Sequence, residues 1–374
     1  DVCSSDLDNR YFSDQLYGDF LVSYNHKFNE ISLSATAGSS FTKTKTAHVD
    51  LWGEGSIFTS PGAGNIYYPN IFTPNNYYGN MSTVSKDDNW ITNKRLNSIF
   101  ATAQVGYHDG LFLDVTARND WSSALAYTES VSFFYPSVGV SALLNKFINM
   151  GKNVDLFKFR ASYSIVGNDV PVYVTNLLYT LGSQGAITPP EKAPFRTLKP
   201  EKTNSLEIGF DGTFFQNRFN LGITYYKTNT KNQFFTIAAP YESGLRNRYV
   251  NAGDVQNQGV EVTAGWFEQF TDNFSWSTNL NFAYNKNEIM KLVDDLPNGL
   301  TLTDFGGAKV ILKKGGEYGD LYVRHIMRDD NGKPLQNEKG EPIVSGDSSE
   351  ELNYAGNMNA KVNMGWSNTF RYKD

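Results

Sequence analysis

The 374-residue chain has a single cysteine, Cys3, and this residue lies in a segment with an unusual origin. The heptapeptide DVCSSDL (1–7) is what one reading frame of a widely used sequencing-adapter oligonucleotide encodes. We interpret residues 1–7 as an artefact and expect the natural N-terminus to be missing, so the lack of a signal peptide says nothing about localisation. Residues 8–374 contain no cysteine, and a cysteine-free chain suits an oxidising cell envelope as well as any other compartment.

Long apolar segments and an excess of positive charge are also missing. No segment approaches the roughly 20 consecutive apolar residues of a membrane-spanning helix, and the mean hydropathy is -0.43. Such a profile still leaves a β-barrel open, because every second residue of a barrel strand faces a wet lumen. The formal net charge of -6 argues against a nucleic-acid-binding protein, since that function requires a basic surface.

The motifs of catalysis and metal binding are absent as well. The histidines have no metal-ligand spacing, and the chain lacks a nucleophile elbow, a Walker phosphate loop and a dinucleotide-binding glycine fingerprint. The acidic segment DDNGKPLQNEKGEP (329–342) does not complete a calcium-binding loop, and its Asn-Gly and proline residues favour ordinary turns. We therefore predict no catalytic residue, no metal, no cofactor and no enzymatic activity.

The chain does contain a repeated alternation of apolar and polar side chains. Within residues 203–229, Leu206 and Ile208 point to one side of a predicted strand while Glu207 and Asp211 point to the other, and the alternation resumes after a short polar turn. The same pattern predicts about eleven strands, at 19–28, 31–41, 95–107, 111–121, 132–144, 156–167, two within 203–229, 255–267, 273–285 and 357–372.

The connections between these strands alternate in length. Shorter turns join the strands at one end and longer loops join them at the other, the longest at 42–94, 168–202, 231–254 and 286–356, with the alternation least clear around 145–155. A soluble sandwich or propeller has no reason to keep that order, because both of its ends face water. The strand lengths also match the roughly 9–11 residues with which a tilted strand crosses a bilayer. The predicted fold is an all-β, antiparallel transmembrane β-barrel with short periplasmic turns and long extracellular loops.

Several segments resemble the SusC/RagA group of TonB-dependent outer-membrane transporters. They are, in order, LFLDVTARNDWSSAL (111–125), SFFYPSVGVSALL (132–144), FKFRASYSIVGN (157–168), LKPEKTNSLEIGFD (198–211), YYKTNTKNQ (225–233), VNAGDVQNQGVEVT (250–263) and AGNMNAKVNMGWSNTFRYKD (355–374). This ordered set runs through roughly three quarters of the chain.

The resemblance implies a location in the outer membrane of a Gram-negative bacterium and a barrel of about 22 strands, of which the predicted strands form about half. It also implies a plug domain and terminal strands that this chain lacks, so residues 8–374 would be a partial barrel. The TonB–ExbB–ExbD complex would act through the missing plug, and a SusD-like surface lipoprotein would serve as a lid. Outer-membrane lipid would surround the barrel, and the cargo would be an oligosaccharide or a peptide.

The candidate cargo-binding residues are aromatic residues of the longest predicted loop. They are Tyr67, Tyr68, Tyr77, Tyr78 and Trp90. Exposed rings beside asparagines would stack on sugar faces or on peptide side chains at the mouth of the barrel. In the alternative interpretation, the rings pack the loop against itself or lie at the lipid interface.

Two other functions use the same sequence features. A passive outer-membrane pore or surface adhesin would have similar strands but neither a plug nor a lipoprotein partner. A secreted all-β glycan-active enzyme would exploit the aromatic loops and would need two carboxylates about 5–10 Å apart in a cleft. The membrane-barrel prediction requires one face of these strands to lie against lipid. Burial of that face beneath a second protein layer would contradict the prediction; its residues include Leu206, Ile208, Phe210, Leu221 and Ile223.

Overall fold

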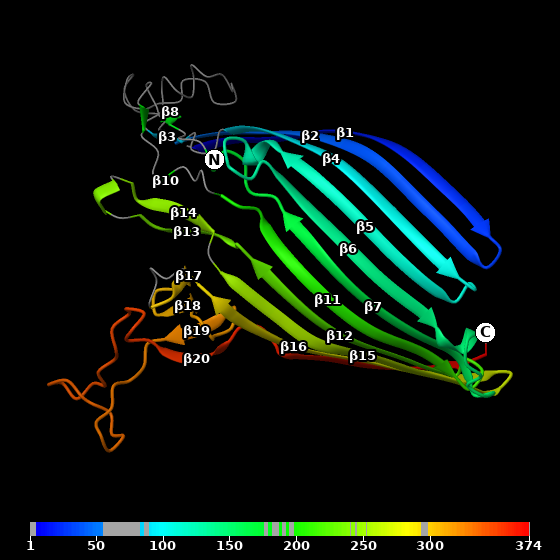
Figure 1. Cartoon of the computed structure of the whole chain (residues 1–374). Helices are drawn as coiled ribbons and strands as arrows, with labels where there is room; N and C mark the ends of the chain where they lie inside the picture. The colour runs from blue at the N-terminus through cyan, green and yellow to red at the C-terminus, as the bar shows by residue number, and fades with distance from the viewer. Residues whose placement is uncertain are drawn as a thin grey trace.

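The computed structural model describes residues 5–54, 83–85, 90–175, 179–181, 187–188, 192–193, 198–239, 241–243, 245–251, 253–292 and 298–373. Its main feature is a curved antiparallel wall in which each strand pairs with the next one (Figure 1). The wall strands are β1 (Ser5–Phe28), β2 (Ile31–Glu54), β4 (Trp90–Tyr107), β5 (Leu111–Ser122), β6 (Ser132–Leu143), β7 (Val154–Asn168), β11 (Glu201–Phe214), β12 (Phe219–Lys231), β15 (Asp254–Thr271), β16 (Phe274–Lys291) and β21 (Val362–Tyr372). This order confirms the predicted all-β fold and its eleven strands.

Tight turns at one end of the wall depend on residues that tolerate a positive φ angle. Asn29 (φ 53°) closes the β1–β2 turn, and His108 and Asp109 (φ 50° and 49°) close the β4–β5 turn. Asparagine, aspartate and histidine adopt this left-handed conformation more readily than other residues with a side chain. These turns fix the strand register, so the apolar residues of neighbouring strands emerge on the same face.

Several wall strands are longer than predicted. β1 and β2 have 24 residues each, and β4, β15 and β16 have 18 each. Residues 42–54 and 90–94, predicted to be loop, therefore belong to β2 and β4. The prediction was wrong there because TKTKT (42–46) has polar side chains on both faces, so the apolar alternation ends while the backbone pairing continues.

For two successive connections, length does not show at which end of the wall each one lies. The β5–β6 connection (123–131), which contains the 3-10 helix η1 (Ser123–Leu125), is no longer than the β6–β7 connection (144–153), which contains η2 (Leu144–Lys146). The pairing of strands shows that these connections lie at opposite ends.

The long-loop end carries small sheets beside the wall (Figure 1). One contains β10 (Lys192–Ala193), β14 (Asn247–Asn251) and β13 (Phe234–Ala238), and β13 is followed by η4 (Tyr241–Ser243). Another contains β17 (Leu300–Asp304), β18 (Ala308–Leu312), β19 (Asp320–Val323) and β20 (Asn353–Asn357). Three short strands complete the order: β8 (Thr180–Leu181) pairs with β9 (Ile187–Thr188), and β3 (Thr83–Ser85) pairs with β2.

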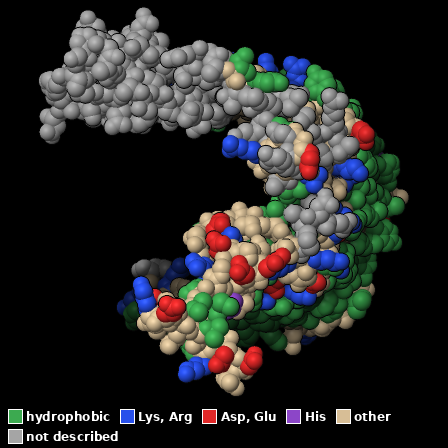
Figure 2. All heavy atoms as spheres, turned by 90° about the vertical axis from the view of Figure 1, so that its left-hand side faces the viewer, with side chains coloured by type: hydrophobic (Ala, Val, Ile, Leu, Met, Phe, Trp, Pro, Cys, Tyr) green, Lys and Arg blue, Asp and Glu red, His purple; other side chains and the backbone are tan. Residues whose placement is uncertain are grey.

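The outward face of the wall is apolar and has no second layer over it. Leu206, Ile208 and Ile223 are 37%, 40% and 39% exposed, and Phe210 and Leu221 are half-buried on the same face. Figure 2, which faces the long-loop end, shows hydrophobic side chains covering the convex side of the wall. This arrangement confirms the predicted orientation and contradicts burial in a closed protein interior.

Buried apolar side chains that pack against one another are concentrated at the long-loop end. One cluster joins Ala124, Leu125, Phe133, Val170, Val174 and Leu198. A second joins Val255, Ile289, Leu292 and Leu312. In the described part of the chain, no helix combines the length and apolarity needed to cross a membrane.

Candidate functional site

Two arginines on the inward face of the wall, Arg118 and Arg160, are each held by a carboxylate and a hydroxyl. Arg118 of β5 donates through Nε to Asp120 Oδ1 (2.8 Å) and through Nη2 to Ser98 Oγ of β4 (2.8 Å). The hydroxyl of Tyr135 on β6 donates to the other carboxylate oxygen of Asp120, whose side chain is only 5% exposed. This network joins three strands and holds the wall together.

A second inward network repeats the arrangement farther along the wall. Arg160 of β7 contacts Asp211 of β11 (3.2 Å) and donates to Thr224 Oγ1 of β12 (2.6 Å). The guanidinium lies over Gly209, where an added Cβ would come within 2.6 Å of the Arg160 Cζ atom. Gly209 therefore leaves the space that the arginine occupies.

The role predicted for the loop aromatics is not tested by the described part of the chain. Tyr67, Tyr68, Tyr77 and Tyr78 lie outside the described residues. Trp90 is the first residue of β4, and its backbone pairs with His48 of β2. The proposed cargo-binding role of these five residues stays a prediction.

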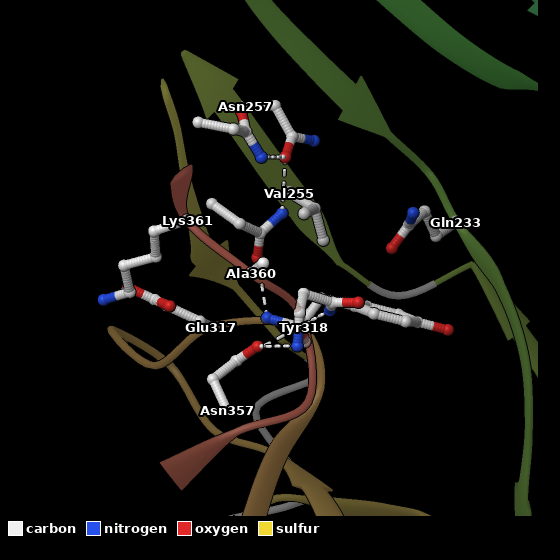
Figure 3. Close-up of a pocket in the computed structure, with 11 residues that line it drawn as sticks. Gln233, Val255, Asn257, Glu317, Tyr318, Asn357, Ala360 and Lys361 are labelled. Carbon is white, nitrogen blue, oxygen red and sulfur yellow. Dashed lines mark hydrogen bonds and ion pairs between the residues drawn. The ribbon is translucent and has the colours of Figure 1, made fainter. Parts of the chain in front are cut away.

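A different set of residues lines a pocket at the long-loop end, on the inward side of the wall (Figure 3). The pocket has a volume of about 450 Å³ and lies between β15, β16, the β12–β13 link, and the segments that precede β19 and follow β20. Its lining is rich in side-chain amides and consists of Gln233, Val255, Asn257, Asn285, Asn287, Glu317, Tyr318, Asn357, Asn359, Ala360 and Lys361.

The wall side of this amide pocket is a hydrogen-bond relay. Asn257 Oδ1 accepts from Asn287 Nδ2 (2.8 Å) and from Asn285 Nδ2 (3.3 Å). The hydroxyl of Tyr226 donates to Asn285 Oδ1 (3.0 Å), and Asn287 Oδ1 accepts from the backbone N–H of Tyr318 (2.6 Å). The relay fixes the orientation of the amides and ties the loop that carries Tyr318 to the wall.

The opposite side of the amide pocket is built from the chain between β20 and β21. Asn359 Nδ2 donates to the Tyr318 carbonyl (2.8 Å), and Lys361 Nζ donates to Glu317 Oε1 (2.7 Å). Gly319 has φ +94°, and a Cβ there would lie 2.6 Å from Asn359 Nδ2. Glycine is therefore required for both the backbone conformation and the close approach of Asn359.

One buried acceptor in the amide pocket is left unpaired by the part of the chain that the structure describes. Gln233 Oε1 is buried and has no hydrogen-bond partner among the described residues. Figure 3 shows Gln233 across the pocket from Lys361. Because an unpaired buried polar group costs about 1–3 kcal/mol, this oxygen favours a ligand that brings a hydroxyl or amide N–H donor.

The ion pair of the amide pocket should persist through neutral pH. The hydrogen bond to Glu317 is the main cause of the raised pKa of Lys361, so the stabilisation from this lysine is complete below its ordinary pKa of 10.5. That stabilisation is lost only as the pH rises through the higher folded-state pKa. We expect ligand affinity, measured by calorimetry, to change little between pH 7 and 9, roughly the range below the lysine pKa. In more alkaline solution the affinity of the unchanged protein should fall, and that of a Lys361→Met variant should not. If the Lys361→Met variant lost affinity in alkaline solution as the unchanged protein does, this role of Lys361 would be contradicted.

Sequence reasoning missed the amide pocket, although a signal was present. Asn285 and Asn287 are separated by one residue of β16, which places both side chains on one face of the strand. Asn357 and Asn359 have the same spacing, but Asn359 follows β20, and its backbone N–H donates to Asn357 Oδ1 (2.7 Å). Asn257 lies at an inward position of β15, since its partner in the ladder is Asn287. No group of three or more potential metal-binding His, Cys, Asp or Glu side chains occurs among the described residues.

A family model described as "TonB dependent receptor-like, beta-barrel" matches residues 4–337. The chain is 27% identical to TonB-dependent receptor P3 of Formosa agariphila over 282 residues, which are 73% of this chain and 27% of that protein. It is also 27% identical to TonB-dependent receptor SusC of Bacteroides thetaiotaomicron over 66% of this chain and 27% of the relative. The chain thus spans about a quarter of the length of these relatives.

Solved structures share the same wall. The RagAB peptide importer in its closed-closed state superposes with a TM-score of 0.77 at 19% identity, covering 98% of this chain and 41% of that one. The outer membrane transporter YddB of Escherichia coli gives a TM-score of 0.54 at 8% identity, covering 98% of this chain and 48% of that one.

These matches confirm the predicted resemblance, the outer-membrane location and the prediction that the chain is not an enzyme. The glycan-active enzyme is excluded on the same ground. With a lipid-facing convex surface, a polar concave surface and a family match through most of its length, the chain belongs to the TonB-dependent receptor-like β-barrel family.

Proposed function

We propose that this chain forms about half of the barrel of an active outer-membrane importer, and that the amide pocket contacts the cargo. The single observation that carries the proposal is the buried, unpartnered Gln233 Oε1 in a pocket of oriented amides on the lumen side. Amides both donate and accept hydrogen bonds, so they suit cargo with alternating donors and acceptors. Oligosaccharides and peptides have that chemistry, and the similar RagAB complex is a peptide importer.

The remaining parts of the importer lie outside this chain. Plug and energy coupling through TonB–ExbB–ExbD are proposed from family membership. A SusD-like lipoprotein over the long-loop end is proposed from the likeness to SusC and RagAB. β1 and β21 are the outer strands of the described wall, so further strands would pair with them to close the barrel.

The Gln233→Met variant tests the proposed contact. Methionine has a similar volume and removes the unpaired acceptor, so the free transporter should keep its stability or gain about 1 kcal/mol. Cargo affinity should fall about tenfold, the equivalent of one lost hydrogen bond in a buried site. Calorimetry on the complete transporter, with panels of oligosaccharides and of peptides, measures the loss of affinity and shows which class of cargo binds.

Asn257→Ala and Gln258→Ala form the matched control pair for this experiment. Asn257 faces the pocket and holds two other amides, whereas Gln258 is its neighbour on β15 and faces the other side. Only the first substitution should weaken cargo binding. Equal affinities for Gln233→Met, Asn257→Ala and the unchanged protein would contradict the role of the amide pocket. Uptake that continues after collapse of the proton gradient would favour the passive pore.

A further inference from the structure

Two pairs of like charges face each other directly on the outward face of the wall. Lys43 of β2 is the ladder partner of Arg95 of β4, and Lys202 of β11 is the ladder partner of Lys231 of β12. All four side chains are exposed. Like charges directly opposite one another destabilise an antiparallel pair. Within the described residues none of the four forms an ion pair, and only Lys231 has an acidic ladder partner, Asp254 of β15.

Both pairs lie where the apolar band ends on the long-loop side. On β11 the outward positions run from Phe214 to Leu206 and then reach Lys202. On β2 they run from Ile31 to Phe41 and then reach Lys43. The apolar stretch of β11 spans eight residue steps, about 27 Å along the strand, which is close to the apolar height of a membrane barrel once tilt is included.

A third cation joins each pair. Lys45 stands two residues beyond Lys43 on the same face of β2, and Lys227 stands at an outward position of β12. We call these sets the β2–β4 patch (Lys43, Lys45, Arg95) and the β11–β12 patch (Lys202, Lys227, Lys231).

Each basic patch has one acidic neighbour in the ladder. Asp14 lies opposite Lys45, and Asp254 lies opposite Lys231, where it accepts from Asn229 Nδ2 (2.8 Å). Three cations and one acid leave each patch with a formal charge of +2. Lys286, at an outward position of β16, is paired with Glu288 (2.9 Å) and adds little.

We propose that the two basic patches bind phosphate groups of lipid headgroups in the leaflet around the long-loop end. A barrel places its lipid-facing residues at fixed depths, so side chains directly above the apolar band meet the headgroup region. Tyr163 and Tyr225 are exposed on the outward face, Tyr163 level with Lys227 and Tyr225 two residues below it, as interfacial aromatics are. A phosphate between two like charges would replace their repulsion with two attractive contacts, and lysine and arginine both bind phosphate.

Removal of the cations should weaken binding of a phosphorylated glycolipid. The complete barrel in neutral detergent is titrated with lipid A that carries phosphate and with the same lipid after dephosphorylation, and bound lipid is counted by native mass spectrometry. We expect Lys202→Thr/Lys231→Thr and Lys43→Thr/Arg95→Thr each to weaken binding of the phosphorylated lipid by about tenfold or more. Dephosphorylated lipid should bind all variants equally.

Lys333→Ala/Lys339→Ala is the matched control, because both lysines are exposed at the long-loop end but lie away from the wall. It should bind lipid as the unchanged protein does. Competition by millimolar inorganic phosphate alone would assign the patches to a free anion and overturn the lipid proposal. Equal binding by the patch variants and the unchanged protein would overturn it too.

Thermal unfolding provides a second test, because the threonine substitutions should affect stability differently without and with phosphorylated lipid. Without anionic lipid, threonine at Lys202 and Lys231 removes a repulsive pair, so the unfolding temperature should stay equal or rise. With phosphorylated lipid, the unchanged protein should gain more stability than the variant, because only its cations bind the phosphate. A variant that is less stable without lipid and gains as much from lipid as the unchanged protein would contradict the proposal.

Discussion

Arginine at Val115 should destabilise the barrel in a lipid bilayer by about 2–4 kcal/mol, the cost measured for a cation at the lipid-facing midplane. Val115 lies near the middle of β5 and is 44% exposed on the outward face, between Ala103 and Val138 in the ladder. No inward residue is within reach of a side chain that points into hydrocarbon, so the charge would remain unpaired or would distort the bilayer.

Thr116→Arg is the matched control for Val115→Arg. Thr116 is the next residue of β5 and faces inward, with Thr102 and Ser137 opposite it. An arginine there can reach water and the carboxylate of Asp114, so we expect a change within about 1 kcal/mol. Reversible denaturant unfolding of the complete barrel in vesicles measures both values. Equal costs for the two substitutions would contradict the assignment of the two faces.

Asp120→Ala should cost about 2–3 kcal/mol, because it leaves the Arg118 guanidinium without its carboxylate in a largely dry part of the wall. Breaking a fully buried ion pair costs about 3–5 kcal/mol. The value expected here is lower because Arg118 is 34% exposed and keeps its bond to Ser98. The loss of the Tyr135 hydroxyl's acceptor contributes to the same cost.

An exposed ion pair provides the comparison for Asp120→Ala. Asp109 contacts Lys27 (2.9 Å) across the short-turn end, and the two side chains are 62% and 55% exposed. The bond to Lys27 lowers the pKa of Asp109, so the stabilisation is present at neutral pH and is lost only in acid, as the pH falls through this lowered value. Asp109→Ala should have little effect on unfolding. A cost at Asp109 as large as that at Asp120 would contradict the role of burial.

Several features of the fold could be predicted from local pattern. The alternation around Leu206 and Glu207 determined which face each side chain takes, because successive residues of a strand must point to opposite sides. The residues of the short turns, such as Asn29, marked where the chain reverses. Where side chains became polar on both faces, as in TKTKT (42–46), the same reasoning placed a loop in what is a paired strand. Backbone hydrogen bonds continue there without any signal in the side chains.

The amide pocket shows the limit of that reasoning. Gln233, Asn257, Asn287 and Asn359 come from separate segments, and asparagine in a loop or strand has no pattern that distinguishes a lumen site from a turn. Their approach depends on the long β16–β21 connection folding back against β15 and β16.

By itself, the sequence determined the strands, their lipid and lumen faces and the family resemblance, since these follow from a two-residue period and from ordered local segments. Only the tertiary structure decided which side chains meet across the wall. The amide pocket, the Arg118–Asp120 network and the opposed cations of the basic patches all depend on ladder register and loop return. Those relations join residues far apart in the chain, and no local period encodes them.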